Sequence, residues 1–471
     1  MVRKHVKTAS TVVAHDLGNT PEPKEGKVTT SEFRPRRKEG SLFKGLAFLS
    51  IIAVCCWLIS RHVVKSLHQL KTATKQLRSI NRLPLSNDVS VHNPKDCMCL
   101  LGDLMVANQA LTETETQEAR IPSANASFVH LAPIVQECHH VIANLEGPIS
   151  HLGIQNDPWK RTSPWYSFSM NPHTVPKLLK DLLGVTAVNR ANNHLLDRGQ
   201  KGIKETDVHL REVGIASFGK GANEEEILQP FLVETPTHRI AITGFGPRRR
   251  ANRYAPSNGK IQGTLPVTLS SVTTAKRLLD AMAHDQTSGE KGAKNKDSRP
   301  LVRLAFVHWG LNYEQKASDD TKEEEQLLIH EGGFDVIVGS DGSHTAQPLE
   351  FVQKKKSTTT ASEKNDTSKS PAYVPVLYNV GNFFFSTPGR YAANGIQGYG
   401  TITQFRFHPH LHLRLYCTII DNAIVHYVPR LCTPDESQDL FTALLKSVPY
   451  EMHESYAEVD LSQVMPSRLL G

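Results

Sequence analysis

Polar side chains that suit metal binding follow a series of apolar, strand-like segments in this chain of 471 residues. They are Asp103, Glu146, Asn193, His308 and His344. Ligands of open α/β sheets collect at the carboxyl ends of the strands, so we expect these side chains to meet. Carboxylate oxygens, an amide oxygen and imidazole nitrogens form a mixed donor set that holds Mn, Fe or Zn. Two such ions about 3.5–4 Å apart polarise a phosphoryl or carbonyl group and generate a hydroxide nucleophile.

Each of these residues also has an ordinary structural explanation. An aspartate at a strand end often caps the next helix. Glu146 would serve equally as a solvated loop acid, and His194, next to Asn193, as a hydrogen-bonded core histidine. The order and placement of the whole set favour a metal site over these separate explanations.

Five short motifs occur in order along the chain. They are Gly102–Met105, Asn144–Glu146, Ala191–Gly199, His308–Gly310 and Tyr378–Phe383. They resemble the successive signatures of the CapA-like family of capsule and poly-γ-glutamate synthesis proteins, over about residues 96–385. That family is related to calcineurin-like metallophosphoesterases. The resemblance therefore implies an α/β fold of two packed mixed β-sheets flanked by helices, in four layers.

The resemblance also implies roles for individual residues. Asp103, Glu146, Asn193, His308 and His344 would be the ligands of one or two divalent ions, Mn, Fe or Zn. The catalytic residues would be His194, as general acid or as the group that orients the substrate, and Asp197. An asparagine ligand leaves the adjacent histidine free to donate a proton. Arg190 and Asn382 would bind substrate.

The last metal loop departs from the family's pattern. That pattern usually reads Gly-x-His-Pro-His, whereas this chain reads Ser340-Asp341-Gly342-Ser343-His344. Gly342 stands at the position of the first histidine and has no ligand atom. Asp341 would supply a carboxylate from one position away, with a different geometry. Two ions, one ion or none therefore stay open.

Two further groups of polar residues have two interpretations each. Arg248 and Arg249 follow the strand-like segment 240–245 and would contact a polyanion such as a glutamate polymer, or belong to a solvated loop. His408, His410 and His412 alternate with other residues, as in a metal-binding stripe. We expect them instead on the polar outer face of an antiparallel sheet.

The elements that must position these residues alternate between strands and helices. Strand-like segments near 98–105, 141–144, 185–189, 215–218, 240–245, 302–307 and 335–338 are separated by helical stretches, which predicts an α/β core. Residues 399–430 read instead as consecutive strands. Segments 286–299 and 354–372 are polar and are expected to be surface insertions. We place one domain at 96–430 and a C-terminal helical tail at 431–471.

Charge and hydropathy predict a membrane anchor. The net charge of +7 divides into +5 over 1–44, +6 over 45–87 and −4 from Asp88 onward, so the basic excess is not a nucleic-acid footprint. Residues 45–60 carry no charge and are expected to form a transmembrane helix. We expect a disordered basic tail at 1–44 and a stalk helix and linker at 61–95, which would pair with a second copy. The large domain is placed on the extracellular or lumenal side. Seven cysteines are too few for a disulfide scaffold in a chain of this length.

Three functions fit these expectations. The first is a membrane-anchored CapA-like enzyme or assembly factor that handles an anionic polymer, by metal-assisted hydrolysis or transfer and beside other polymer-synthesis subunits. The second is a phosphoesterase acting on a small or lipid phosphate. The third is a non-catalytic module that binds polymer or partner proteins through a decayed metal site.

Overall fold

The apolar segments of the chain pair into two sheets in the computed structural model. It describes residues 96–106, 128, 130–152, 167–248, 262–284, 297–354, 372–385, 391–420, 429–462 and 464–469 (the described residues). All of them belong to one compact unit of the chain, residues 73–471.

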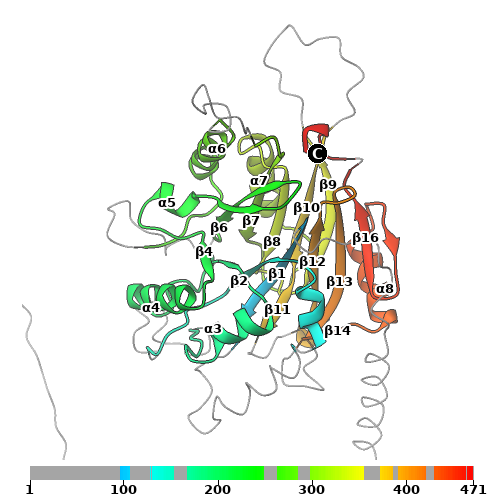
Figure 1. Cartoon of the computed structure of the whole chain (residues 1–471). Coiled ribbons are helices and arrows are strands. Elements are labelled where there is room, and N and C mark those ends of the chain that lie inside the picture. The colour runs from blue at the N-terminus through cyan, green and yellow to red at the C-terminus, as the bar shows by residue number, and fades with distance from the viewer. Residues whose placement is uncertain are drawn as a thin grey trace, which may run out of the picture. The chain divides into compact units, whose positions relative to one another are not determined.

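The first sheet has ten strands within the described residues (Figure 1). Its order is β15-β16-β13-β12-β1-β2-β3-β4, with β11 paired to β1 and β14 to β13. Strands β1 to β4 run parallel, and β12, β13 and β16 are antiparallel to their neighbours. The strands are β1 (Cys97–Met105), β2 (His140–Leu145), β3 (Ala187–Asn189), β4 (Ala216–Phe218), β11 (Asn382–Phe385), β12 (Tyr399–Arg406), β13 (His412–Ile420), β14 (Pro429–Leu431), β15 (Glu451–Met452) and β16 (Tyr456–Asp460).

The second sheet has six strands within the described residues, in the order β5-β6-β7-β8-β10-β9. Strands β6, β7, β8 and β10 are parallel, and β5 and β9 are antiparallel edge strands. The strands are β5 (Phe231–Glu234), β6 (Arg239–Phe245), β7 (Leu301–His308), β8 (Val336–Ser340), β9 (Ala346–Gln353) and β10 (Tyr373–Val380).

The main apolar core lies between the two sheets. Alternate residues of β1 divide between its two faces: Met98 and Leu100 join this core, whereas Cys99 and Leu101 join a second core on the outer face of the sheet. Helices α6 and α7 cover the outer face of the second sheet, through residues such as Leu279. The helices are α3 (Val175–Lys177), η5 (Leu178–Leu182), α4 (Gly199–Glu212), α5 (Glu224–Leu228), α6 (Leu269–His284), α7 (Asp319–His330), η6 (Ala392–Asn394), α8 (Pro434–Leu444) and η7 (Ser467–Leu469). The predicted α/β architecture of two packed mixed sheets flanked by helices is confirmed.

The C-terminal segment differs from its prediction. Strand β16 pairs with β13 inside the ten-stranded sheet, and Leu440 and Phe441 of α8 belong to the core between the sheets. The expected helical tail at 431–471 is therefore wrong, because α8 is the α-helix of this segment while β15 and β16 extend the sheet. The domain does not end at 430, since Leu469 is still part of the same core.

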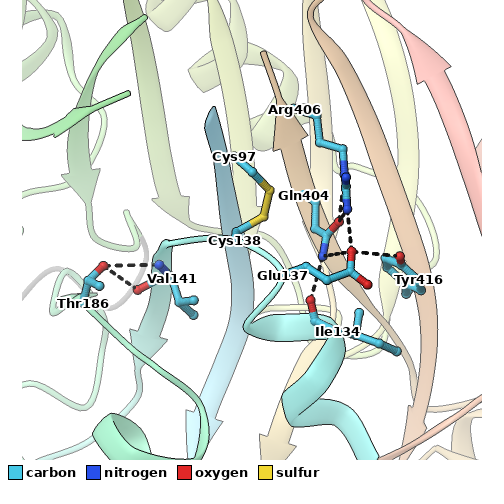
Figure 2. The surroundings of a disulfide bond; sticks show 9 residues. All are labelled: Cys97, Ile134, Glu137, Cys138, Val141, Thr186, Gln404, Arg406 and Tyr416. Atoms are coloured by element: carbon cyan, nitrogen blue, oxygen red, sulfur yellow. Dashed lines mark hydrogen bonds and ion pairs between the residues drawn. A yellow bond between two sulfur atoms is a disulfide. The ribbon is translucent and has the colours of Figure 1, made fainter. Parts of the chain in front are cut away.

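Two disulfides tie together elements of the ten-stranded sheet. Cys97 of β1 is bonded to Cys138, just before β2, and Cys417 of β13 to Cys432, just after β14. Figure 2 shows the first bond beside the outer face of the sheet, where Glu137 receives hydrogen bonds from Arg406 and Tyr416. Cys99 keeps a buried free thiol.

The predicted transmembrane anchor, residues 45–60, lies outside the described residues. The predicted tail at 1–44 and the predicted stalk and linker at 61–95 also lie outside them. Most of the two expected insertions, 286–299 and 354–372, also falls outside them. Among the described helices, none combines the length and apolar composition that crossing a bilayer would need.

Candidate metal centre

The predicted ligands come from the carboxyl ends of parallel strands in both sheets. Asp103 lies near the end of β1, Glu146 follows β2, and Asn193 lies in the loop after β3, all in the first sheet. His308 is the last residue of β7 in the second sheet, and the next loop begins at Asp341, directly after β8. Because the two sheets pack face to face, these ends meet at one edge of the shared core.

Gly102, in the first motif, allows β1 to pass close to the motif Tyr378–Phe383. A Cβ atom at Gly102 would collide with the carbonyl oxygen of Gly381, which lies in the motif between β10 and β11. Asp103 pairs in register with Asn382, the residue after Gly381. The two motifs therefore lie side by side, and the absence of a side chain at 102 permits this close approach.

The imidazole of His308 is the centre of the cluster. Its Nε2 lies 2.9 Å from Asn193 Oδ1, 3.2 Å from Asp341 Oδ2 and 3.9 Å from Glu146 Oε1. These oxygens come from three different loops, and His308 has no exposed surface. Three of the five predicted ligands thus gather here, together with Asp341.

Asp103 lies on the other side of this imidazole. Its Oδ1 is 3.7 Å from His308 Nδ1, and its Oδ2 accepts a hydrogen bond of 2.8 Å from the backbone N–H of Asp341. Candidate ligand atoms of Asp103, His308 and Asp341 all lie within 4.8 Å of one another, and all three residues are buried. Two carboxylates and one imidazole at this spacing form a donor set suited to one divalent ion.

The electrostatics of the cluster favour a cation. Burial, and next the charge of Asp341, raise the pKa of Asp103 above its ordinary range, because two buried carboxylates repel each other. A divalent ion between them would relieve this repulsion. The buried, oxygen-rich surroundings of His308 therefore fit the ion that the family resemblance implies.

His194 lies beside the cluster in a fixed orientation. Its Nδ1 is 2.7 Å from Asp197 Oδ2, and its ring stacks on Phe168 at a centroid distance of 3.9 Å. The backbone N–H of Phe168 donates to the same carboxylate oxygen, at 2.7 Å. His194 Nε2 faces inward, 3.5 Å from Glu146 Oε1. The two predicted catalytic residues therefore form a dyad that adjoins the predicted ligands.

The last loop of the cluster is built around its glycine. A Cβ atom on Gly342 would lie 2.5 Å from the carbonyl carbon of Gly310 and 2.7 Å from the nitrogen of Leu311. Asp341 takes a left-handed backbone conformation, with φ of 77°, which aspartate tolerates better than most residues. Gly342 is thus packed against a neighbouring loop, and the carboxylate of Asp341 is the candidate donor from this segment.

His344 lies at the rim of the site. Its ring centroid is 4.9 Å from that of Tyr313 and 6.2 Å from that of Phe385. Phe385 in turn packs on Phe168, at 5.5 Å. His344 thus belongs to an aromatic border next to the dyad, and its role as a ligand stays a prediction, because Asp341 is the residue of this loop that lies with Asp103 and His308.

The four predicted substrate-binding residues have different surroundings. Arg190 has no exposed surface, and its Nη1 contacts Asp207 of α4 at 3.4 Å, so in this conformation it offers no face to a substrate. Asn382 is buried, and its Nδ2 donates to the hydroxyl of Tyr391. Arg248 is half-exposed and pairs with Glu323 at 3.2 Å. Arg249 lies outside the described residues.

A cavity of about 440 Å³ adjoins the cluster. Asp341 and Arg248 both line it, together with Trp309 and Glu324. Burial raises the pKa of Glu324 to about 7. The cavity therefore gives the cluster an adjacent space with the guanidinium of Arg248 at its border.

Asn144 has a role that sequence reasoning missed. Its Nδ2 donates to Asp103 Oδ1 at 2.6 Å and lies 3.2 Å from His308 Nδ1, while its Oδ1 accepts from Asn192. It thus links ligands from both sheets. The available signal was its place in the motif Asn144-Leu145-Glu146, two residues before a predicted ligand.

Comparison with known proteins agrees with the motifs. The capsule biosynthesis protein CapA of Bacillus anthracis is 24% identical over 249 residues, covering 52% of this chain and 54% of that protein. The PGA biosynthesis protein CapA of Bacillus subtilis is 21% identical over 289 residues, covering 60% and 62%. The chain therefore spans between half and two thirds of these relatives.

Solved structures give weaker likenesses. A calcineurin-like phosphoesterase from Bacillus subtilis aligns with a TM-score of 0.31 and 10% identity, covering 79% of this chain and 93% of that one. A hypothetical protein from Thermus thermophilus aligns with a TM-score of 0.31 and 13% identity, covering 71% and 95%.

The family described as "Bacterial capsule synthesis protein PGA_cap" matches residues 98–387, which hold all five motifs and every residue of the cluster. This match covers more than half of the 471 residues, and the chain belongs to this family.

Proposed function

We propose that this protein is a membrane-anchored, metal-dependent hydrolase or transferase that acts in the synthesis or export of an anionic cell-surface polymer such as capsule or poly-γ-glutamate. The observation that carries the proposal is the buried cluster of Asp103, His308 and Asp341, with the His194–Asp197 dyad beside it. Relatives named for capsule and PGA biosynthesis support the polymer as the substrate class.

Asp103, His308 and Asp341 would hold one divalent ion, with Asn193 and Glu146 next to them. When bound, such an ion supplies Lewis acidity that polarises a phosphoryl or carbonyl group. Asn144 keeps Asp103 and His308 in place through its amide. The protein's contribution is therefore a donor set held rigidly by two packed sheets.

The dyad would handle the proton. Asp197 accepts from His194 Nδ1, which leaves Nε2 as the atom that faces the cluster. The stacked ring of Phe168 prevents the imidazole from turning away. A histidine fixed in this way gives a proton to a leaving group at Nε2, and the carboxylate behind it stabilises the charged ring.

The adjoining cavity would receive the polymer. Arg248 at its border would pair with a carboxylate or phosphate of the chain. Glu324 titrates near neutrality, so it is partly uncharged there and donates a hydrogen bond instead of repelling an anion. These two residues would position an anionic unit beside Asp341.

We further propose that the domain lies outside the cytoplasm. Its two disulfides support this placement, because disulfides persist in oxidising compartments and are rare in the cytosol. The charge-free segment 45–60 would be the anchor, and the stalk would bring together two copies or other polymer-synthesis subunits.

Metal content and turnover together test the proposed function. The purified full chain is loaded with Mn²⁺ or Zn²⁺, its bound metal is measured, and hydrolysis of poly-γ-glutamate is compared with that of a generic phosphodiester. We expect at least one bound ion and cleavage of the polymer, which His194→Asn should lower about 100-fold or more without lowering the metal content. Preference for the phosphodiester would favour the phosphoesterase alternative. A chain that binds no divalent ion would refute the enzymatic proposal and leave a binding module.

A further inference from the structure

A second cavity, of about 700 Å³, lies on the outer face of the ten-stranded sheet, away from the candidate metal centre. It is bordered by the turn between β12 and β13 and by the β15–β16 hairpin. Arg406, on its wall, pairs in register with Cys97 at the start of β1, whereas Asp103 is six residues further along that strand. At about 3.3 Å per residue, this places the two sites about 20 Å apart along the strand.

Histidines and carboxylates gather in this cavity, which we call the histidine cavity. Three pairwise contacts link four of its side chains, which we call the four donors: His412 lies near Glu458, Glu458 near His453, and His453 near Glu451. His408 and His410 also line it, but they lie in the turn before β13, which begins at His412. The expectation that all three alternating histidines share a strand face is therefore wrong for these two.

The tautomer of His412 is fixed by the backbone. Its Nδ1 is 2.9 Å from the carbonyl oxygen of His410, and a carbonyl only accepts, so Nδ1 carries the hydrogen. In the neutral ring, Nε2 is then a bare lone pair, and it lies 3.5 Å from Glu458 Oε1. The lone pair on Nε2 therefore needs a cation or a hydrogen-bond donor, whereas Glu458 Oε1 beside it already accepts two hydrogen bonds from Arg414.

The second histidine has the same need. His453 Nε2 is buried and makes no hydrogen bond to any described residue. It lies 3.7 Å from Glu451 Oε1 and 3.6 Å from Glu458 Oε2, too far for good hydrogen bonds. A tetrahedral ion with bonds of about 2.0–2.1 Å separates adjacent ligand atoms by roughly 3.3 Å. The two contacts of His453 would therefore shorten slightly on binding, and the other side chains would have to move toward the ion.

The charges around the histidine cavity also favour a dication. Two guanidinium groups, of Arg406 and Arg414, line the cavity with three carboxylates, those of Glu451, Glu458 and Asp460. Glu137, which is not part of the lining, pairs with Arg406. Arg414 binds Glu458 through Oε1 at 2.6 and 2.9 Å and leaves Oε2 toward His453. Such support behind a carboxylate ligand is typical of metal sites. Glu451 has an exposed side chain that is free to swing toward an ion.

We propose that the four donors bind one divalent ion of the zinc class, at a second site that is separate from the candidate metal centre. Imidazole and carboxylate together prefer Zn²⁺ and its neighbours over Mg²⁺ or Ca²⁺. The ion would join β13 to the β15–β16 hairpin. The proposal does not depend on the catalytic function proposed above.

Zinc titration of the full chain against a chromophoric chelator tests this site. The Asp103→Asn, His308→Gln double variant disables the first centre, and we expect it to keep one equivalent of Zn²⁺. Adding His412→Gln and His453→Gln should weaken that equivalent at least 100-fold. The matched control is His209→Gln, which removes a histidine 3.4 Å from Glu212 on α4, outside the histidine cavity, and should change nothing.

Substitution with Co²⁺ gives a second readout. Tetrahedral Co²⁺ absorbs strongly in the visible range, and this band should persist in the double variant of the first centre and disappear with the two added changes. Equal melting temperatures in EDTA would show that all variants fold. If the double variant does not fold, the wild-type chain should bind one equivalent more than the His412→Gln, His453→Gln variant. Retention of all zinc by the variants lacking His412 and His453, or no zinc at all in the folded double variant of the first centre, would overturn the proposal.

Discussion

Replacing Asp341 by asparagine should weaken metal binding while it stabilises the metal-free protein. Asparagine keeps the shape of the side chain but removes a charge that lies 3.2 Å from His308 Nε2 and within 4.8 Å of the other candidate ligand atoms. Changes in residues that only support a ligand typically cost 10–100-fold in affinity. Loss of a charged ligand should therefore cost about 100-fold or more in affinity for Mn²⁺ or Zn²⁺.

The opposite effect on stability follows from the repulsion between the two aspartates. Two carboxylate charges within 4.8 Å of each other repel by at least about 3.5 kcal/mol at an effective dielectric of 20. The pKa of folded Asp103 is raised, so the folded state binds more protons than the unfolded state over the pH range between the two pKa values. The free energy of unfolding of the metal-free chain therefore falls as pH rises from about 4 toward neutrality. In Asp341→Asn this fall should be smaller, with a gain of about 1–3 kcal/mol at pH 8.

Denaturant unfolding in EDTA at pH 5 and pH 8 measures the stability, and competition with a chelating dye measures the affinity. His344→Gln is the matched control from the same loop, and we expect it to change affinity less than about threefold, because Asp341 is the loop's donor within the cluster. The reasoning fails if Asp341→Asn destabilises the metal-free chain at pH 8. It also fails if His344→Gln weakens metal binding more than Asp341→Asn does.

Three other predictions concern the last loop, the anchor and an insertion. Gly342→His should not raise metal occupancy and should lower the free energy of unfolding by about 2–5 kcal/mol, since its Cβ would meet the backbone of Gly310; a gain in bound metal would contradict the described packing. The full chain should stay with membranes after a carbonate wash, whereas a chain beginning at Asp88 should be soluble; a full chain released by the wash would exclude the anchor. Replacing residues 355–371 with a short Gly-Ser linker should shift the melting temperature by less than about 2 °C, because lengthening or shortening a surface loop changes its closure entropy little; a large drop would show that the segment packs.

The sequence predicted the layered fold because its strands are short, apolar and separated by helical patterns. Strand β1 at Cys97–Met105 and β7 at Leu301–His308 lie almost where the apolar runs predicted them. The C-terminal segment was harder, since β16 (Tyr456–Asp460) alternates in polarity and is stabilised by pairing with β13, over forty residues earlier. Pairing between strands that are distant in the sequence leaves little signal in the local sequence. The helical pattern of α8 therefore dominated the prediction for this segment.

The sequence predicted the candidate ligands that precede the last loop better than it predicted the donor within that loop. Asp103 and His308 lie at the carboxyl ends of their strands and Asn193 in the loop after β3, so the topology of parallel sheets brings them together. The last loop contains both Asp341 and His344, and motif alignment favoured the histidine. Which of these two side chains lies in the cluster depends on the backbone angles of the loop, since a φ of 77° at Asp341 turns the loop around Gly342. Local sequence does not encode that turn strongly, because it depends on contact with the neighbouring loop at Gly310.

The division of the cluster between two sheets limits when an ion can bind during folding. Asp103 and Glu146 belong to the first sheet, whereas His308 and Asp341, more than 150 residues later in the chain, belong to the second. Neither sheet alone offers all three candidate donors, because Asp103 comes from the first sheet and His308 and Asp341 from the second, so a partly folded chain has no complete coordination sphere. An ion could therefore bind only after the two sheets have packed together. Bound metal would then indicate that the two halves of the domain have joined.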